Sequence, residues 1–380
     1  MTNPLAAFSV DELRQRKSEK WQHYGPDVLP LWVAEMDSTI AEPVTEVLAQ
    51  ALATADTGYA SGNDYGQAFS EYAAAEWNWD LNPHDTFPVI DVMRGIAEVI
   101  RQFSDSDGSV IITPPVYYPF AKVVQGTGRH LINAPLTTLG RLQESTLVEA
   151  LDHARARGKS IMILLSNPHN PTGVAHTQAE LVMVARLARE YGARIVSDEI
   201  HGPLMMPGFS FIPLLSVPGA ENAIVVTSAS KSFNLAGLKA ALVVGGSESA
   251  AEIRKVSDHF IGASHWGMLA HSAAYRAGQP WLDQVIVNIQ SNSELLTGLL
   301  SQHMRGALYR PVQATYLAWV DFRPLGLGDD PAKLFLDKGK VAFSSGPTFG
   351  PGGEGCIRVN LATSPAILTE AIERAASSLT

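Results

Sequence analysis

The sequence has 380 residues, of which 46% are hydrophobic and 17% charged. A chain of this kind can bury roughly three-quarters of its unfolded surface, so we expect one large or two medium globular domains and exclude a disordered chain. The formal net charge is −10 and no segment gathers Lys and Arg into a basic stripe, which argues against nucleic acid as a partner.

Neither a membrane span nor a secretory signal is expected from the sequence. Its aliphatic runs are far shorter than the roughly 20 residues that cross a bilayer, and the first residues contain no basic stretch followed by an apolar one. Cys356 is the single cysteine, so an intramolecular disulfide is impossible. We therefore expect a cytoplasmic protein without a membrane partner.

The first predicted elements are two helices separated by a segment that contains proline. Ser9 and Glu12 have the spacing of a capping box, which predicts the start of a helix. The segment 29–37, LPLWVAEMD, follows, and apolar residues at helical spacing then predict a second helix over residues 44–52.

Strands and helices alternate in the middle of the chain. A buried strand is predicted at residues 161–166, and a capping box at Thr177 and Glu180 starts the helix after it. Further apolar runs predict strands, at residues 194–197, 223–227 and 240–244. This alternation favours an α/β fold with a mostly parallel sheet.

The pattern changes beyond about residue 275. A long helix is predicted at roughly 281–303, and strands are predicted within YLAWVDF and CIRVNL. We interpret this part as a smaller α+β domain on which the N-terminal segment packs. The predicted large domain is residues 45–275, and the small domain is residues 1–44 and 276–380.

Three consecutive predicted strands end in side chains that can act together. The loops after them carry Asn170, Asp198 and Lys231, and strand ends of an open α/β sheet commonly hold the ligand. An enclosed lysine beside another cation becomes nucleophilic and can form a Schiff base with a carbonyl. Nearby serines and Lys239 could bind an anion such as phosphate. A cofactor with an aldehyde and a phosphate would satisfy each group.

The motifs SNPHNPTG, SDEIH, SASKSFNLAGLK and CIRVN occur in an order and spacing that resemble the fold-type-I pyridoxal phosphate (PLP) enzymes of the aminotransferase class I/II superfamily. The segment LPLWVAEMD, His169 and His201 resemble the MalY/PatB-like cystathionine β-lyase (C–S lyase) branch. The resemblance implies a large domain with a mostly parallel sheet flanked by helices, plus a smaller α+β domain.

The resemblance also implies roles for residues around the cofactor ring. Lys231 would form the Schiff base with PLP, and Asp198 would pair with the ring nitrogen. Asn170 would bond the ring oxygen and lie beside the substrate. Tyr117 would stack on the ring, with Tyr118 as the alternative.

Phosphate contacts are implied for a second group: Ser228, Ser230, Lys239 and the amides of Met93 and Arg94. The superfamily usually has a small, glycine-containing turn at the last two positions, whereas this chain has Asp91-Val92-Met93-Arg94-Gly95.

Further implied contacts involve the substrate and a second subunit. Arg358 would grip the substrate α-carboxylate. Tyr59 would reach the phosphate of a neighbouring subunit, which implies a homodimer with shared active sites. His201 stands where many aminotransferases have tyrosine and is assigned to the cofactor pocket. His169 and His201 lack metal-ligand spacing, so no metal is expected.

The function implied by the resemblance is β-elimination from L-cystathionine or a related S-substituted cysteine, giving a thiol, pyruvate and ammonia, as in methionine metabolism. Lys231 would also be the base that removes the α-proton. Two alternatives stay open. One is a PLP-dependent aminotransferase, and the other is a PLP-binding regulatory protein with a surface for a protein partner.

Overall fold

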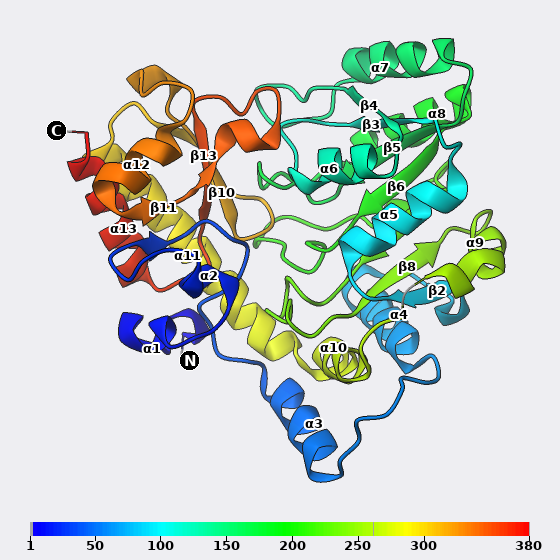
Figure 1. Ribbon diagram of the computed structural model, residues 1–380, viewed down its shortest axis with the longest axis horizontal. Helices are drawn as coiled ribbons and strands as arrows, with labels where there is room; N and C mark the ends of the chain where they lie inside the picture. Colours follow the sequence, from blue (N-terminus) through cyan, green and yellow to red (C-terminus); the bar gives the residue numbers. More distant parts are fainter. Residues whose placement is uncertain (1–2, 261, 380) are drawn as a thin grey trace.

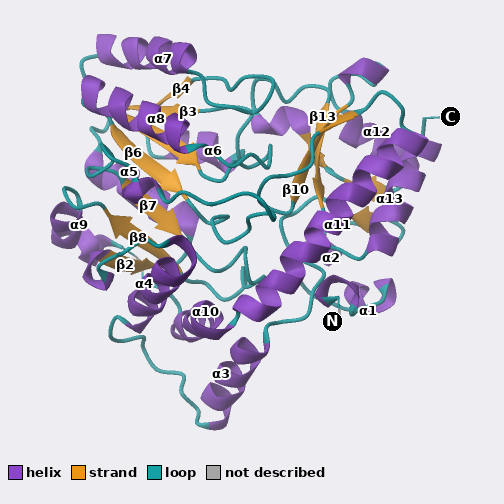
Figure 2. Cartoon of the chain, turned by 180° about the vertical axis from the view of Figure 1, so that it is seen from behind, coloured by secondary structure: helices purple, strands orange, loops and turns teal. Residues whose placement is uncertain are grey.

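The computed structural model describes residues 3–260 and 262–379. Its two main sheets have seven and four strands, and a further pair of short strands joins the two ends of the chain. Figures 1 and 2 show the larger sheet on one side of the molecule and the smaller one on the other.

The seven-stranded sheet is mostly parallel. In spatial order its strands are β2 (Thr86–Val89), β8 (Ala241–Gly245), β7 (Ile224–Thr227), β6 (Arg194–Asp198), β5 (Ile161–Ser166), β3 (Ser109–Ile112) and β4 (His130–Asn133). Strands β4, β3, β5, β6 and β7 run parallel, and β8 is antiparallel to both of its neighbours. Carboxyl ends of the central strands therefore meet at one edge.

Apolar side chains on both faces explain why these runs form central strands. In β5, Ile161, Ile163 and Leu165 belong to one hydrophobic cluster, and Met162 and Leu164 belong to the other. Side chains alternate between the faces of a strand, so a run that is apolar throughout is buried when helices cover both faces.

Helices cover the two faces of this sheet (Figure 1). One cluster receives side chains from α5 (Val92–Phe103), α6 (Pro119–Gly126) and α9 (Ala250–Val256). The other receives them from α4 (Asp64–Trp77), α7 (Glu144–Ala156), α8 (Gln178–Tyr191) and α10 (His265–Ala277). Helix α3 (Glu42–Ala53) packs against α10.

The smaller sheet is antiparallel and is built mainly from the C-terminal third of the chain. Its strands, in spatial order, are β12 (Ser344–Ser345), β13 (Cys356–Asn360), β10 (Leu317–Asp321) and β9 (Leu308–Tyr309). The helices of this part are α11 (Gln279–His303), α12 (Pro331–Gly339) and α13 (Pro365–Ser377).

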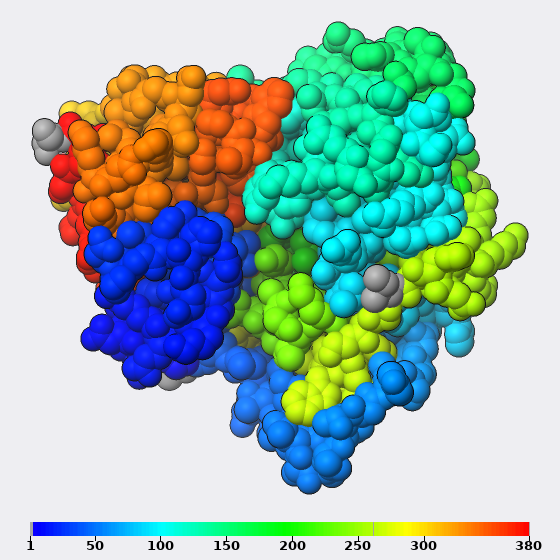
Figure 3. Space-filling view, in the orientation of Figure 1, coloured from blue at the N-terminus to red at the C-terminus, as the bar shows by residue number. Residues whose placement is uncertain are grey.

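The N-terminal segment lies on this C-terminal part. It contains the short helices α1 (Val10–Arg14) and α2 (Glu19–Gln22), and its strand β1 (Leu29–Pro30) pairs in parallel with β11 (Val341–Ala342). Figure 3 shows the N-terminal residues in blue against the C-terminal ones in orange. The division at residues 44/45 and 275/276 remains our proposal for the domain boundaries.

The predicted α/β class and mostly parallel sheet are confirmed, as are both capping boxes, at Ser9 and Thr177. The strand predicted at 240–244 is present but antiparallel, because the described residues between β7 and β8 contain no crossover helix to return the chain for a parallel pair. Within the described residues, no helix combines the length and apolar character needed to span a membrane.

Candidate active site

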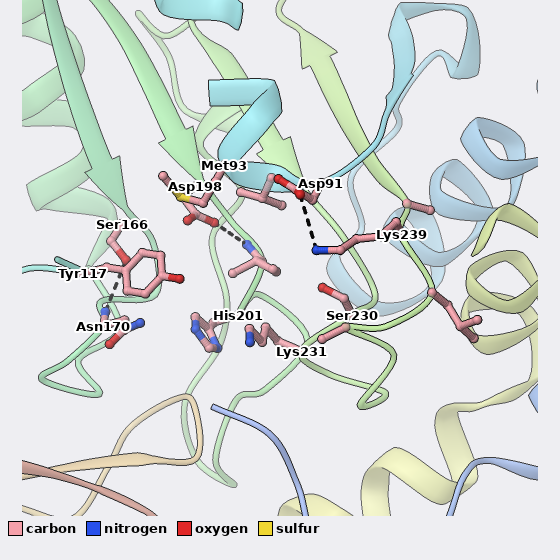
Figure 4. Close-up of a pocket in the computed structure, with 15 residues that line it drawn as sticks. Asp91, Met93, Tyr117, Ser166, Asn170, Asp198, His201, Ser230, Lys231 and Lys239 are labelled. Atoms are coloured by element: carbon pink, nitrogen blue, oxygen red, sulfur yellow. Dashed lines mark hydrogen bonds and ion pairs between the residues drawn. The ribbon is translucent and has the colours of Figure 1, made fainter. Parts of the chain in front are cut away.

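The ends of two neighbouring strands and the loop after a third line one cavity. Strand β5 ends at Ser166, which is paired in register with Asp198 at the end of β6, and Asp198 is in turn paired with Val226 of β7. The chain leaves β7 directly into the loop that carries Lys231. These ends open into a cavity of about 200 Å³ (Figure 4).

Most of the predicted site residues line this cavity. They are Lys231, Asp198, Asn170, Tyr117, Ser230, Lys239, Met93 and His201. Arg358 contacts one of them, Asn170, from the other sheet. The loops after three parallel strands and the start of α5 are thus brought together as the strand order requires.

Lys231 is held by a backbone carbonyl from the N-terminal segment. Its Nζ donates a hydrogen bond to Ala34 O at 2.8 Å. Burial and the positive charge of Arg358 lower the pKa of Lys231 to about 8, although Glu35 and Asp198 oppose the shift. An amine in this state is neutral often enough near neutral pH to act as a nucleophile or a base.

Asp198 is a buried carboxyl group without a cationic partner in ion-pair contact among the described residues. Its Oδ1 accepts a hydrogen bond from Ile200 N at 3.1 Å. Burial raises the pKa of Asp198 to about 7, against the effects of the Ile200 amide and Lys231. A positively charged N–H group at this position would favour the ionised form.

Arg358 lies in β13 and is 3% exposed. Its Nη1 donates to Asn170 Oδ1 at 2.9 Å, and Nη2 donates to Trp32 O at 2.9 Å and Ser344 Oγ at 3.1 Å. Burial lowers its pKa to about 10. Across the described part of the chain no carboxylate forms an ion pair with it, and its buried Nε has no partner. An anionic ligand would supply what this guanidinium lacks.

Two aromatic residues were candidates for stacking on a cofactor ring, and the structure separates them. Tyr117 lines the cavity, and its amide donates to Asn170 O at 3.0 Å. Burial raises the pKa of Tyr117 to about 12, so its phenol stays neutral. Tyr118 is exposed and does not line the cavity, so Tyr117 is the better candidate.

His201 lines the cavity as a neutral imidazole. Burial, with Lys231 and Arg358 nearby, lowers its pKa to about 3. Its buried Nδ1 has no hydrogen-bond partner in the described structure, and its ring lies 6.2 Å from that of Tyr316. The sequence did not point to Tyr316, whose fully buried side chain lies close enough to Arg358 and Tyr117 for their charges to act on it.

At the other end of the cavity, groups suited to an anion surround Asp91. Ser230 and Lys239 line this end, and Asp91 Oδ2 lies 3.4 Å from Lys239 Nζ (Figure 4). The sequence analysis named Asp91 as part of the segment 91–95 but assigned it no role. Its position just before an apolar helical run was the available signal, since aspartate is a common N-cap.

Besides Arg358, three predicted residues do not line the cavity. The hydroxyl of Ser228 donates to Ala240 O at 2.7 Å and accepts from Ser230 N. The Arg94 amide already donates to Asp91 Oδ1. Tyr59 is fully exposed. Their proposed phosphate contacts therefore stay predictions.

Known proteins are similar to this chain along nearly its whole length. The profile of the family described as aminotransferase class I and II matches residues 34–375. A Mycobacterium leprae protein, provisionally named cystathionine beta-lyase, is 45% identical over 98% of this chain and 97% of its own. Cystathionine beta-lyase PatB of Bacillus subtilis is 30% identical over 96% of this chain and 97% of its own.

A solved structure gives the same result in three dimensions. A Corynebacterium diphtheriae protein, provisionally described as a PLP-dependent beta-cystathionase, is 34% identical to this chain with a TM-score of 0.92. The match covers 99% of each chain, so it extends over both sheets.

Proposed function

The chain belongs to the aminotransferase class I and II family, and from this we propose that it is a PLP-dependent carbon–sulfur lyase. Its reaction is β-elimination from L-cystathionine or a related S-substituted L-cysteine, which yields a thiol, pyruvate and ammonia. One observation carries the proposal: Lys231 and Asp198 line one cavity and Arg358 bonds Asn170 of the same cavity, in a chain whose relatives over nearly its whole length bear the name cystathionine beta-lyase.

The residues present fit PLP. Asp198 is a buried carboxyl group that needs a cation, which suits a protonated ring nitrogen. Asn170 and Tyr117 would hold the ring oxygen and the ring face, and Ser230 and Lys239 would hold the phosphate. When bound, PLP supplies an aldehyde that takes up an amine and a ring that withdraws electrons from the substrate Cα.

Lys231 moves the proton at the reacting carbon. Its Nζ accepts the proton from the substrate Cα, and its pKa of about 8 suits a base that works near neutral pH. The resulting ammonium group is also our candidate for returning a proton to the leaving sulfur. His201 is neutral and its Nδ1 is unpartnered, so it can accept or donate a hydrogen bond beside this amine.

Arg358 and Asn170 orient the substrate. The guanidinium is charged, buried and without an anionic partner among the described residues, so a substrate α-carboxylate would neutralise it. Its bond to Asn170 Oδ1 ties the carboxylate site in β13 to the ring site after β5. This contact sets the distance between the groups that would bind the substrate carboxylate and the cofactor ring.

A single assay tests the reaction. The protein is incubated with PLP and L-cystathionine in the absence of any keto acid, and pyruvate and free thiol are followed with time. We expect sustained multiple turnover. A single turnover that stops until 2-oxoglutarate is added would identify an aminotransferase and contradict the proposal.

We also propose that the active unit is a homodimer in the cytoplasm. Tyr59 lies in the exposed segment 54–62, which follows α3 at the edge of the molecule in Figure 1, so its ring is free to reach a second copy. The buried, unpaired Cys356 is compatible with a reducing compartment. Sedimentation and cell fractionation test the two parts separately.

A further inference from the structure

The anion-binding end of the cavity contains an acidic side chain. Lys239 and Ser230 line this end together with Asp91. Figure 4 shows Asp91 and Lys239 next to each other, on the side of the cavity away from Asn170 and Tyr117. A carboxylate therefore lies among the groups that would attract a phosphate.

Asp91 already contacts two donors at the anion-binding end of the cavity, the Arg94 amide and the Lys239 ammonium group. Its backbone is extended at the N-cap of α5, and its Oδ1 accepts a hydrogen bond from Arg94 N at 2.9 Å. Its Oδ2 lies 3.4 Å from Lys239 Nζ. The amides of Val92 and Met93 have no acceptor within the helix, because they belong to its first turn. These two amides are left for a phosphate, which must share Lys239 with Asp91.

The ion pair between Asp91 and Lys239 compensates the charge of the Asp91 carboxylate only weakly. Its two side chains are 52% and 33% exposed, and pairs of this kind are weak. Asp91 therefore keeps negative charge facing the cavity. Two anions that share one lysine and one helix start repel each other, so the carboxylate must weaken the binding of a second anion.

We propose that Asp91 opposes the phosphate of PLP and makes this chain hold its cofactor more loosely than the remaining contacts would allow. The inference rests on the proposed function, since it needs PLP in this cavity. Lys231, Asp198 and Asn170 would bind the aldehyde and ring end. The side chain of Asp91 instead contacts the Arg94 amide and Lys239. Asp91 thus sets how readily the cofactor is exchanged.

The experiment separates the phosphate end from the aldehyde end. Cofactor-free protein is titrated with PLP and, in parallel, with pyridoxal, which lacks the phosphate, and binding is followed by visible absorbance. The proteins compared are the wild type, Asp91→Asn, Asp91→Ser and Glu98→Gln. Asn and Ser cap helices about as well as Asp. Glu98→Gln removes a charge from the same helix, two turns from its start.

We expect Asp91→Asn and Asp91→Ser to bind PLP on the order of tenfold more tightly than wild type. Binding of pyridoxal should not change, and Glu98→Gln should match wild type for both ligands. Inorganic phosphate should compete with PLP at lower concentration in the two Asp91 variants.

Unchanged PLP binding in both Asp91 variants would overturn the inference, because Asp91 would then have no net effect on the phosphate. Weaker binding in both would also overturn it, because Asp91 would then orient Lys239 toward the phosphate. In either case normal PLP binding by the wild type would still support PLP as the cofactor. A wild-type chain that bound neither PLP nor pyridoxal would overturn both proposals. Thermal unfolding checks that each variant is folded, and Asp91→Ser decides the question if Asp91→Asn is unfolded.

Discussion

Lys231 is the side chain whose loss we expect to be most damaging. Replacing it with alanine should abolish the visible absorbance of lysine-bound PLP and lower turnover by roughly 10²- to 10⁴-fold or more, because one amine serves both purposes. Absorbance and steady-state kinetics measure the two effects. Lys159→Ala, at an exposed surface lysine, is the control. If the absorbance persists, borohydride reduction and peptide mapping will identify the lysine that carries PLP.

The pKa of Lys231 predicts how imine formation depends on pH. Burial and Arg358 lower this pKa to about 8, and only the neutral amine attacks an aldehyde. The rate at which cofactor-free protein reacts with pyridoxal should therefore rise with pH up to about 8 and level off above it. A solvated lysine would keep reacting faster up to about pH 10. Stopped-flow absorbance distinguishes the two profiles.

Arg358 is expected to act on substrate binding. Arg358→Lys keeps the charge but loses the planar fork, and one lost charge-assisted hydrogen bond costs about 1.5–3 kcal/mol. We expect kcat/KM to fall roughly 10- to 150-fold, mainly through KM. Arg323→Lys is the control, because Arg323 is exposed and pairs with Asp321. Equal kinetics for the two variants would remove Arg358 from the substrate site.

Among the structural elements, the segment 32–37 joins the two parts of the site. Trp32 O accepts a hydrogen bond from Arg358, and Ala34 O accepts one from Lys231. Asn360 Nδ2 donates to the carbonyls of residues 33 and 35, and Asn234 bonds the backbone of Met36. This segment therefore sets the position of the amine relative to the guanidinium.

A buried ion pair anchors the end of the same segment. Lys20 Nζ lies 2.7 Å from Asp37 Oδ2, and both side chains are at most 1% exposed. Trp21 Nε1 and Thr363 Oγ1 also donate to Asp37. These contacts connect α2, the segment 32–37 and the residues that follow β13.

Removing one member of this pair should destabilise the fold. Lys20→Met leaves the Asp37 carboxylate buried without a cation, which costs about 3–5 kcal/mol in the free energy of unfolding. Lys333→Met, in an exposed pair with Asp337, should change it by no more than about 0.5 kcal/mol. Urea denaturation measures both. Similar small values would show that the Lys20–Asp37 pair does not anchor the segment.

At the level of the whole molecule, the prediction concerns shared active sites. Tyr59→Phe should impair cofactor binding, and Lys231→Ala should abolish turnover. If Tyr59 serves the neighbouring subunit, mixing the two variants and reassembling them as heterodimers should restore part of the activity, because one site then has both native residues. A fully active monomer in sedimentation would contradict this prediction, as would mixtures that stay inactive.

Local sequence determined the secondary structure around the site. Ser9 and Thr177 each accept a hydrogen bond from the amide three residues later, and both helices begin where this spacing predicted. Strand β5 coincides with the apolar run 161–166. Capping bonds and apolar periodicity involve residues within one or two turns of the chain, so they can be recognised without the rest of the fold. The order and spacing of the motifs also indicated the family to which the chain belongs.

Only the tertiary structure decided which groups meet. Arg358 contacts Asn170, which is 188 positions away, and Lys231 contacts Ala34, which is 197 positions away. Spacing also could not show that Ser230 lines the cavity while the Ser228 hydroxyl bonds Ala240, or that Asp91 lies beside Lys239. These contacts form when the two sheets and α5 pack together. Their geometry depends on many residues that are distant in the sequence, so no short motif predicts it.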